Sequence, residues 1–513
     1  MGQSRTKKST VNAMCALIAR MLTLILGFVS RAIFLKFLTT EYLGVNGLFS
    51  NVLTMLSFAE LGIGNAIQFS LYKPLKDGDE DKIKTLMRFY KNAYKIIGIS
   101  VFVLGIALLP FMDFIVEEKP TITENLTVIY LLFIGNSAVS YLFSYKQTLF
   151  QADQRAYVVT LSNSCMAVMQ NVVHILVLFL TKNYLIYLIG TIACTILNNL
   201  FIAWLANRKY PYLKDKEVNR LDSTEKKALF TNVKALSISK VAGVACNGTD
   251  NIIITKLLGL TSVGLVSNYT LIINTMSGMV YSMLTGMTGS VGNLNAEEDL
   301  QKRKKIFNQL MMLSYLIYAC ISTCLIVLIN HFIAEVWLGA QYVIDMKTIV
   351  ALVLIAFQSG MNFTAYTFRT TVGCFNEVKY IYVATAIVNI LLSIVLGKWL
   401  GLAGVFLATT ISKLLTCELA DGYYAYKRAL HVHPTKYFMK LISYYLLFAV
   451  NVLICYLVVK FISIGGLWGF LIKGCVCFAL SNLINILVLC RTEAFKGLLG
   501  KAKLLIMKKT RRS

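Results

Sequence analysis

Long apolar runs alternate with short polar connections along nearly the whole chain. A membrane-spanning helix needs about 20 mostly apolar residues, and fourteen runs approach or exceed that length. They lie at residues 12–36, 44–70, 93–116, 126–149, 157–180, 184–206, 234–257, 263–289, 308–330, 343–368, 380–398, 402–425, 440–462 and 467–490. The pattern therefore predicts an all-α membrane protein with 14 transmembrane helices.

Lysine and arginine are concentrated in every second connection. The basic set comprises residues 5–8, 73–91, 208–227, 302–305, 427–436 and 491–512. The opposite set holds about one base per connection: Lys36, Lys119, Lys182, Lys256, Lys347, Lys398 and Lys460. Because short basic loops stay in the cytoplasm, the alternation predicts that both termini are cytoplasmic. The same distribution explains the net charge of +25 without a nucleic-acid partner.

Composition limits where a function can reside. The chain of 513 residues is 57% hydrophobic and 15% charged, with a mean hydropathy of +0.66. Its longest hydrophilic stretch, near residues 207–232, is too short for an extramembrane domain. The 12 cysteines fall mostly in apolar runs and form no paired CxxC set, so they are interpreted as small core residues and no metal site is expected.

The sequence contains an internal repeat. A displacement of 220 residues places Arg20 on Lys240 and Gly44 on Gly264, and a displacement of 223 places Lys146 on Arg369. Six spans separate the copies, so both have the same orientation and their axis is expected along the membrane normal. The predicted domains are a six-helix lobe at 1–206, a cytoplasmic linker at 207–233, a six-helix lobe at 234–427, and helices 13 and 14 with a basic tail at 428–513.

Several charged residues lie inside predicted spans. Arg20 and Arg31 are separated by about three helical turns, which places both on one helix face roughly 16 Å apart. Lys240 is the repeat equivalent of Arg20, so the two lobes would present cations at similar depth. We expect Arg20, Arg31, Lys240 and Lys413 to bind an anionic substrate in a cavity between the lobes.

Other interpretations of these charges remain open. Arg31 and Lys240 lie near helix ends, where long side chains reach the interface. Glu60 is at the depth of Arg20 and is a candidate structural partner for it. Asp250 is a candidate partner for a base or a ligand for a coupling cation. Glu60 and Asp250 are therefore the candidate ion-coupling or charge-partner residues.

Further polar residues in the spans are interpreted more simply. His174 is alone on an apolar helix, which is typical of a hydrogen-bonded core residue rather than a proton carrier. Glu418 and Asp421 approach the cytoplasmic end of their helix, where we expect water to solvate them. Lys413 and Lys473 have no such explanation from position alone.

No catalytic constellation is present. The chain has no phosphate-binding loop, no HExxH sequence and no nucleophile elbow, which disfavours an enzyme and an ATP-driven pump. No cofactor is expected. A passive carrier, or one coupled to a Na⁺ or H⁺ gradient or to the membrane potential, fits the pattern better.

Four segments resemble bacterial polysaccharide transporters, the oligosaccharide flippases of surface polysaccharide pathways. They are FLTTEYLGVNGLFSNVLTMLSFAELGIGNAI at residues 37–67, LFQADQRAY at 149–157, DNIIITKLLGLTSVGLVSNY at 250–269 and GLAGVFLATTIS at 401–412. The likeness covers nearly the full chain. Each motif is a weak glycine and apolar pattern, and the order of the motifs together with the span count carries the resemblance.

The resemblance implies a fold of the MOP superfamily, shared with multidrug exporters and lipid II flippases, in which two six-helix bundles form a V around a cationic cavity. It also implies a bacterial plasma-membrane location and a substrate, an undecaprenyl-pyrophosphate-linked oligosaccharide, moved to the outer leaflet by alternating access. Membrane lipids, a polysaccharide polymerase and glycosyltransferases are the implied partners. A lipid II flippase, a multidrug exporter and a polymerase-type membrane enzyme are the alternatives.

Overall fold

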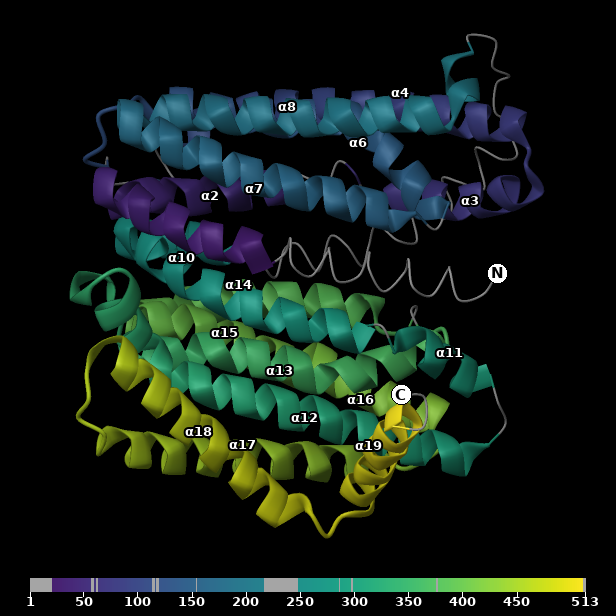
Figure 1. Cartoon of the computed structure of the whole chain (residues 1–513), viewed down its shortest axis with the longest axis vertical. Coiled ribbons are helices and arrows are strands. Elements are labelled where there is room, and N and C mark those ends of the chain that lie inside the picture. Colours follow the sequence, from purple (N-terminus) through teal and green to yellow (C-terminus); the bar gives the residue numbers. More distant parts are fainter. Residues whose placement is uncertain are drawn as a thin grey trace. The chain divides into compact units, whose positions relative to one another are not determined.

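The computed structural model describes residues 21–56, 60, 63–112, 116, 120–153, 155–215, 248–285, 287–296, 299–374 and 377–510, and these residues are almost entirely helical (Figure 1). The chain divides into two compact units, residues 1–264 and 265–513. Each unit is described by itself. Most of the predicted linker, 207–233, lies outside the described residues.

Unit 1 contains helical residues 21–37, followed by α2 (Thr40–Leu56), α3 (Ile63–Asp77), α4 (Glu80–Ala107), η2 (Leu109–Phe111), α6 (Leu126–Ala152), α7 (Ala156–Thr181), α8 (Tyr184–Lys209), η3 (Pro211–Lys214) and the first part of α10 (Asp250–Thr285). Helix α6 packs against both α4 and α8. Two apolar clusters fill the unit, one around Tyr90 and Leu149 and the other around Phe49 and Tyr130. These clusters hold the helices that carry the polar groups of unit 1.

Unit 2 contains the rest of α10, then α11 (Thr288–Ala296), α12 (Leu300–His331), η4 (Phe332–Trp337), η5 (Ala340–Tyr342), α13 (Met346–Thr371), α14 (Lys379–Leu400), α15 (Leu402–Lys413), η6 (Leu414–Glu418), α16 (Leu419–Tyr424), η7 (Ala425–Ala429), α17 (Thr435–Lys460), α18 (Gly466–Leu489) and α19 (Glu493–Thr510). Residues 402–429 form one span containing two π-helical turns, η6 and η7. Helix α12 contacts α13, α17, α18 and α19, so it is the centre of the unit.

The described residues include 10 helices that are long and apolar enough to cross a membrane, or 11 if the bent pair Leu126–Leu142 and Tyr145–Ala152 is one span. The chain is therefore a multi-pass membrane protein. Three of the predicted spans have no counterpart in that set, namely 12–36, 44–70 and 234–257, and each includes residues outside the described ranges. The count of 14 remains a prediction.

Helix boundaries in the two halves follow the displacement of 220 residues. The displacement relates the helix break at Thr39 to the break at Gly259, the N-cap Asp79 to the N-cap Asp299, and the N-cap Asn125 to the N-cap Asp345. Each of these caps accepts a hydrogen bond from a backbone N–H in the first turn of its helix. The connection at 372–378 is longer than its counterpart at 153–155, which locates the extra residues of the second half.

Two glycines bring α2 and α10 together within unit 1. A Cβ atom added at Gly44 would lie 2.0 Å from the backbone oxygen of Leu260, and one added at Gly264 would lie 2.2 Å from the backbone oxygen of Thr40. The displacement of 220 residues converts one contact into the other. Such an exchange is the pattern of a twofold axis, and the close backbone approach requires glycine at both positions.

Candidate functional site

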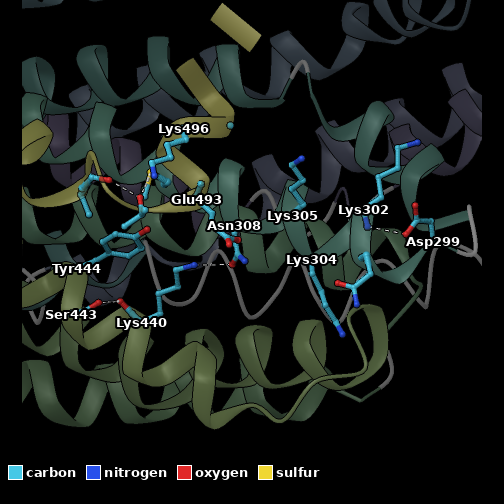
Figure 2. Close-up of a pocket in the computed structure, with 16 residues that line it drawn as sticks. Asp299, Lys302, Lys304, Lys305, Asn308, Lys440, Ser443, Tyr444, Glu493 and Lys496 are labelled. Carbon is cyan, nitrogen blue, oxygen red and sulfur yellow. Dashed lines mark hydrogen bonds between the residues drawn. The ribbon is translucent and has the colours of Figure 1, made fainter. Parts of the chain in front are cut away.

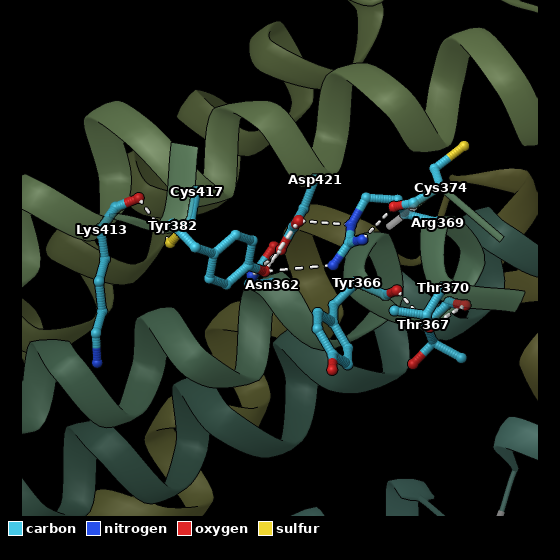
Figure 3. A network of polar contacts seen from close by, with 10 residues as sticks. All are labelled: Asn362, Tyr366, Thr367, Arg369, Thr370, Cys374, Tyr382, Lys413, Cys417 and Asp421. Carbon is cyan, nitrogen blue, oxygen red and sulfur yellow. Dashed lines mark hydrogen bonds and ion pairs between the residues drawn. The ribbon is translucent and has the colours of Figure 1, made fainter. Parts of the chain in front are cut away.

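A buried ion pair joins α13 to α16 in unit 2. The Nε atom of Arg369 donates to Oδ1 of Asp421 at 2.7 Å, and the two side chains are 3% and 0% exposed. Arg369 lies in the last turn of α13, and its Nη1 also donates to the backbone oxygen of Cys374 (Figure 3). The guanidinium is therefore fully engaged in structural contacts.

Asp421 is also the acceptor for two neutral side chains. Asn362 Nδ2 donates to it at 2.8 Å, and the Tyr382 hydroxyl lies 3.1 and 3.0 Å from its two oxygens. These contacts connect α13, α14 and α16 through one carboxylate (Figure 3). Low dielectric strengthens each of these hydrogen bonds, and it also makes the loss of any partner costly.

The expectation that water solvates Glu418 and Asp421 is wrong. Glu418 is 3% exposed and Asp421 is 0% exposed, because their part of the span packs against α13, and α16 also packs against α17. Position near a helix end was the signal that misled the prediction. The pairing with Arg369, 52 residues earlier in the chain, leaves no local pattern in the sequence.

Acceptor oxygens without donors surround Glu418. In the described part of the chain, Glu418 Oε2, Gln358 Oε1 and Asn362 Oδ1 are buried and have no hydrogen-bond partner. The amide of Gln358 donates instead to the backbone oxygen of Thr410 at 3.0 Å. Buried oxygens of this kind are satisfied by a proton on the carboxyl group, by water or by a cation. Glu418 is thus chemically suited to exchange a proton or hold a cation.

We predict that Glu418→Gln leaves the fold intact and raises thermal stability slightly, because it removes a charge that is buried without full compensation. The midpoint of thermal unfolding of the full chain in detergent measures this effect. A large fall in the midpoint would show that the Glu418 carboxylate is a structural anchor. The neighbouring Asp421, whose oxygens are all engaged, provides the contrast.

Lys413, a predicted substrate-binding residue, lies half-buried at the end of α15. Its side chain points away from the Asp421 network, whereas its backbone oxygen accepts a hydrogen bond from the Cys417 thiol (Figure 3). Lys473, also singled out in the sequence, lies 3.4 Å from His331 Nδ1. The structure therefore gives Lys473 a neighbour on α12 and leaves a binding role for Lys413 as a prediction.

Glu60 in unit 1 is held by a tyrosine cluster. The Tyr94 hydroxyl donates to Glu60 Oε1 at 2.6 Å, and Tyr94 packs edge-on against Tyr90 with 4.4 Å between ring centroids. The predicted partner Arg20 lies outside the described residues, as does Lys240. The interpretation of Glu60 as the partner of Arg20 therefore remains a prediction.

Arg31 lies half-buried in unit 1 and interacts electrostatically with Tyr187. Tyr187 stacks on His174 at 3.9 Å, and His174 Nε2 is 2.9 Å from the hydroxyl of Thr191. His174 is 7% exposed, so its prediction as a hydrogen-bonded core residue is confirmed. Arg31 thus borders an aromatic, polar part of the helix bundle.

Asp250 is the first residue of α10 and is half-buried. The next residue, Asn251, is the repeat equivalent of Arg31, and its side chain donates to the backbone oxygen of Gly47 at 3.3 Å. Asp250 therefore lies beside the glycine contact of α2 and α10. Its role as an ion-coupling residue stays a prediction.

The fold resembles that of MOP superfamily transporters. An inward-facing multidrug resistance transporter of the MATE family aligns with a TM-score of 0.65 at 12% identity, covering 81% of this chain and 98% of that one. The inward closed form of the lipid II flippase MurJ aligns with a TM-score of 0.64 at 13% identity, covering 93% of this chain and 98% of that one. A MOP superfamily transporter from Pyrococcus furiosus, described as having a binding pocket of reverse polarity, aligns with a TM-score of 0.57 at 12% identity, covering 82% and 96%.

No protein-family model and no curated protein matches the sequence. At these identities the structural likeness defines the fold, and the expectation of a fold shared with multidrug exporters and lipid II flippases is confirmed. The chain is therefore a membrane protein with the architecture of a transporter.

Proposed function

We propose that the protein is a flippase that moves an undecaprenyl-pyrophosphate-linked oligosaccharide from the inner to the outer leaflet of the bacterial plasma membrane, for surface polysaccharide assembly. The observation that carries the proposal is the extent of the structural match. The lipid II flippase covers 93% of the chain, whereas the multidrug transporter covers 81%. The difference is close to the combined length of α17 and α18, which have 26 and 24 residues.

The charges in the spans also support an anionic substrate. Arg20, Arg31, Lys240 and Lys413 would hold the pyrophosphate, with the arginines forming bidentate contacts to phosphate oxygens. The prenyl chain would stay in the lipid. Outward movement of negative charge across a membrane that is negative inside is favourable by about 2.3 kcal/mol per charge per 100 mV, so the membrane potential can drive the step.

The multidrug alternative fits the charges less well. Organic cations need free carboxylates, and Asp421, the most deeply buried acid in unit 2, is already paired with Arg369. A lipid II flippase is the second candidate, since its structure matches the larger share of this chain. Its substrate also carries a pyrophosphate, so the two candidates differ in the sugar.

Complementation tests the proposal. In a strain that lacks its oligosaccharide flippase and accumulates the lipid-linked intermediate, the protein is expected to restore surface polymer and clear the intermediate. Rescue of a strain deficient in lipid II flipping, without rescue of the polysaccharide strain, would assign the second candidate. Failure in both strains, with the protein folded in the membrane, would contradict a flippase function.

We predict that Arg20→Ala abolishes this rescue while the protein remains folded and membrane-inserted, because the deepest predicted phosphate contact is lost. Arg155→Ala is the matched control, since Arg155 is 40% exposed and pairs with Asp153 away from the predicted cavity residues. Arg20→Lys is expected to keep partial activity if charge alone matters. Normal surface polymer with Arg20→Ala would refute the role of this residue.

A further inference from the structure

An open cleft of about 1040 Å³ lies in unit 2 at the ends of α12, α17, α18 and α19. Five lysines and two carboxylates line it, and we refer to it as the basic cleft (Figure 2). The charged residues are Lys302, Lys304, Lys305, Lys440, Lys496, Asp299 and Glu493. Positive charge therefore predominates in a space large enough for a sizeable ligand.

Three of these lysines are available for a ligand. Within the described ranges, the side chains of Lys304, Lys305 and Lys496 form neither an ion pair nor a hydrogen bond. One of the two acids, Asp299, serves as the N-cap of α12 and accepts the backbone N–H of Lys302 at 3.0 Å. The excess positive charge in the basic cleft is therefore not neutralised by the surrounding side chains.

The floor of the basic cleft is firmly packed. Tyr444 is 3% exposed and stacks on Tyr315 with 4.5 Å between ring centroids. Lys440 donates to Asn308 Oδ1 at 2.8 Å and thereby joins α17 to α12 (Figure 2). The backbone of α19 approaches α12 so closely that a Cβ atom at Gly497 would lie 2.1 Å from the side chain of Gln309. The cleft is thus a built space between packed helices.

The basic cleft lies where lipid headgroups are expected. Exposed apolar side chains begin within the same turns of α17 and α18 that border the cleft: Met439 at 64%, Ile442 at 59%, Leu446 at 64%, Leu487 at 66% and Val488 at 56%. In a membrane-spanning helix such side chains face acyl chains. The connections that supply the lysines belong to the set that the charge alternation predicts to be cytoplasmic.

We propose that the basic cleft binds the phosphate headgroup of an anionic phospholipid in the inner leaflet. Basic pockets between transmembrane helices on the cytoplasmic side are suited to acidic lipid headgroups, since the lysines meet the phosphate while the adjacent apolar surface meets the acyl chains. The site is separate from the predicted substrate residues Arg20, Arg31, Lys240 and Lys413. It therefore does not depend on the transported substrate.

The test uses the full chain purified in a neutral detergent and titrated with phosphatidylglycerol or, as a zwitterionic control, phosphatidylcholine. Bound lipid is measured by native mass spectrometry. The parent is expected to bind phosphatidylglycerol in preference to phosphatidylcholine. The triple variant Lys304→Gln, Lys305→Gln, Lys496→Gln is expected to bind phosphatidylglycerol about tenfold more weakly or worse. The matched control, Lys398→Gln, Lys436→Gln, Lys460→Gln, removes three exposed lysines outside the cleft and should retain the preference.

A triple variant with arginine at positions 304, 305 and 496 is expected to retain binding, which separates loss of charge from damage to the fold. Equal binding by the glutamine variant and the parent, or equal loss in the matched control, would overturn the proposal. Two further arms compare other sources of phosphate. Inorganic pyrophosphate that binds the cleft when phosphatidylglycerol shows no preference would assign a soluble ligand instead. Undecaprenyl pyrophosphate that binds at least tenfold more tightly than phosphatidylglycerol would assign the carrier lipid instead.

Discussion

Asp421→Asn is expected to destabilise unit 2 by about 3–5 kcal/mol, the cost of removing one partner from a buried ion pair. The loss is large because Arg369 is 3% exposed and would keep its charge without a counter-ion. Asparagine preserves the shape of the side chain, so the effect isolates charge. Thermal unfolding of the full chain in detergent, followed by the helical signal, is the measurement.

Two comparisons make this result specific. Replacing both members, Arg369→Met with Asp421→Leu, is expected to recover much of the loss, because no charge then remains buried. Asp81→Asn is the surface control: Asp81 is 79% exposed and pairs with Lys84 at 2.7 Å, and such pairs contribute about 1 kcal/mol or less. An unfolding midpoint for Asp421→Asn equal to that of the parent would mean that the buried pair does not stabilise the unit.

Gly44→Ala is expected to lower stability by about 1–3 kcal/mol or more, because the new methyl group would lie 2.0 Å from the backbone oxygen of Leu260. Alanine normally favours a helix over glycine by about 1 kcal/mol, so the sign of the effect reports the clash. Gly264→Ala, which meets the backbone oxygen of Thr40 at 2.2 Å, is expected to cost a similar amount. Unfolding midpoints of the two variants check the equivalence.

Gly27→Ala is the control for both glycine variants. A Cβ atom at Gly27 meets nothing within 4 Å, so this substitution should leave stability unchanged or raise it. Stability losses at Gly44 and Gly264 that differ greatly would show that the two contacts are not equivalent in energy. Parental stability at both positions would show that α2 and α10 separate without cost.

Much of the fold was predictable because its signals are long. Apolar runs of about 20 residues and the alternation of basic connections extend over the whole chain, so local errors do not obscure them. The displacement of 220 residues was detectable from matches such as Gly44 with Gly264, and it recurs in the helix caps and breaks. The span count stays open where the most polar runs, 12–36 and 234–257, lie largely outside the described residues.

The polar interior was harder to predict because its contacts are distant in sequence. A lone histidine on an apolar helix has one common explanation, and His174 follows it. Glu418 and Asp421 were misplaced because a position near a helix end does not reveal how deeply that end is packed. The lysines of the basic cleft were attributed to topology, since only the packing of α12 against α17 and α19 gathers them into one site.

The paired contacts of Gly44 with Leu260 and of Gly264 with Thr40 have an evolutionary consequence. Two identical six-helix chains associating about a twofold axis would touch each other in this same reciprocal way. The protein thus retains the contact pattern of an ancestral homodimer whose gene was duplicated and fused. Fusion freed each half to diverge, and the Arg369–Asp421 pair, whose first-half equivalents at that displacement are Leu149 and Phe201, records a change that only one descendant acquired.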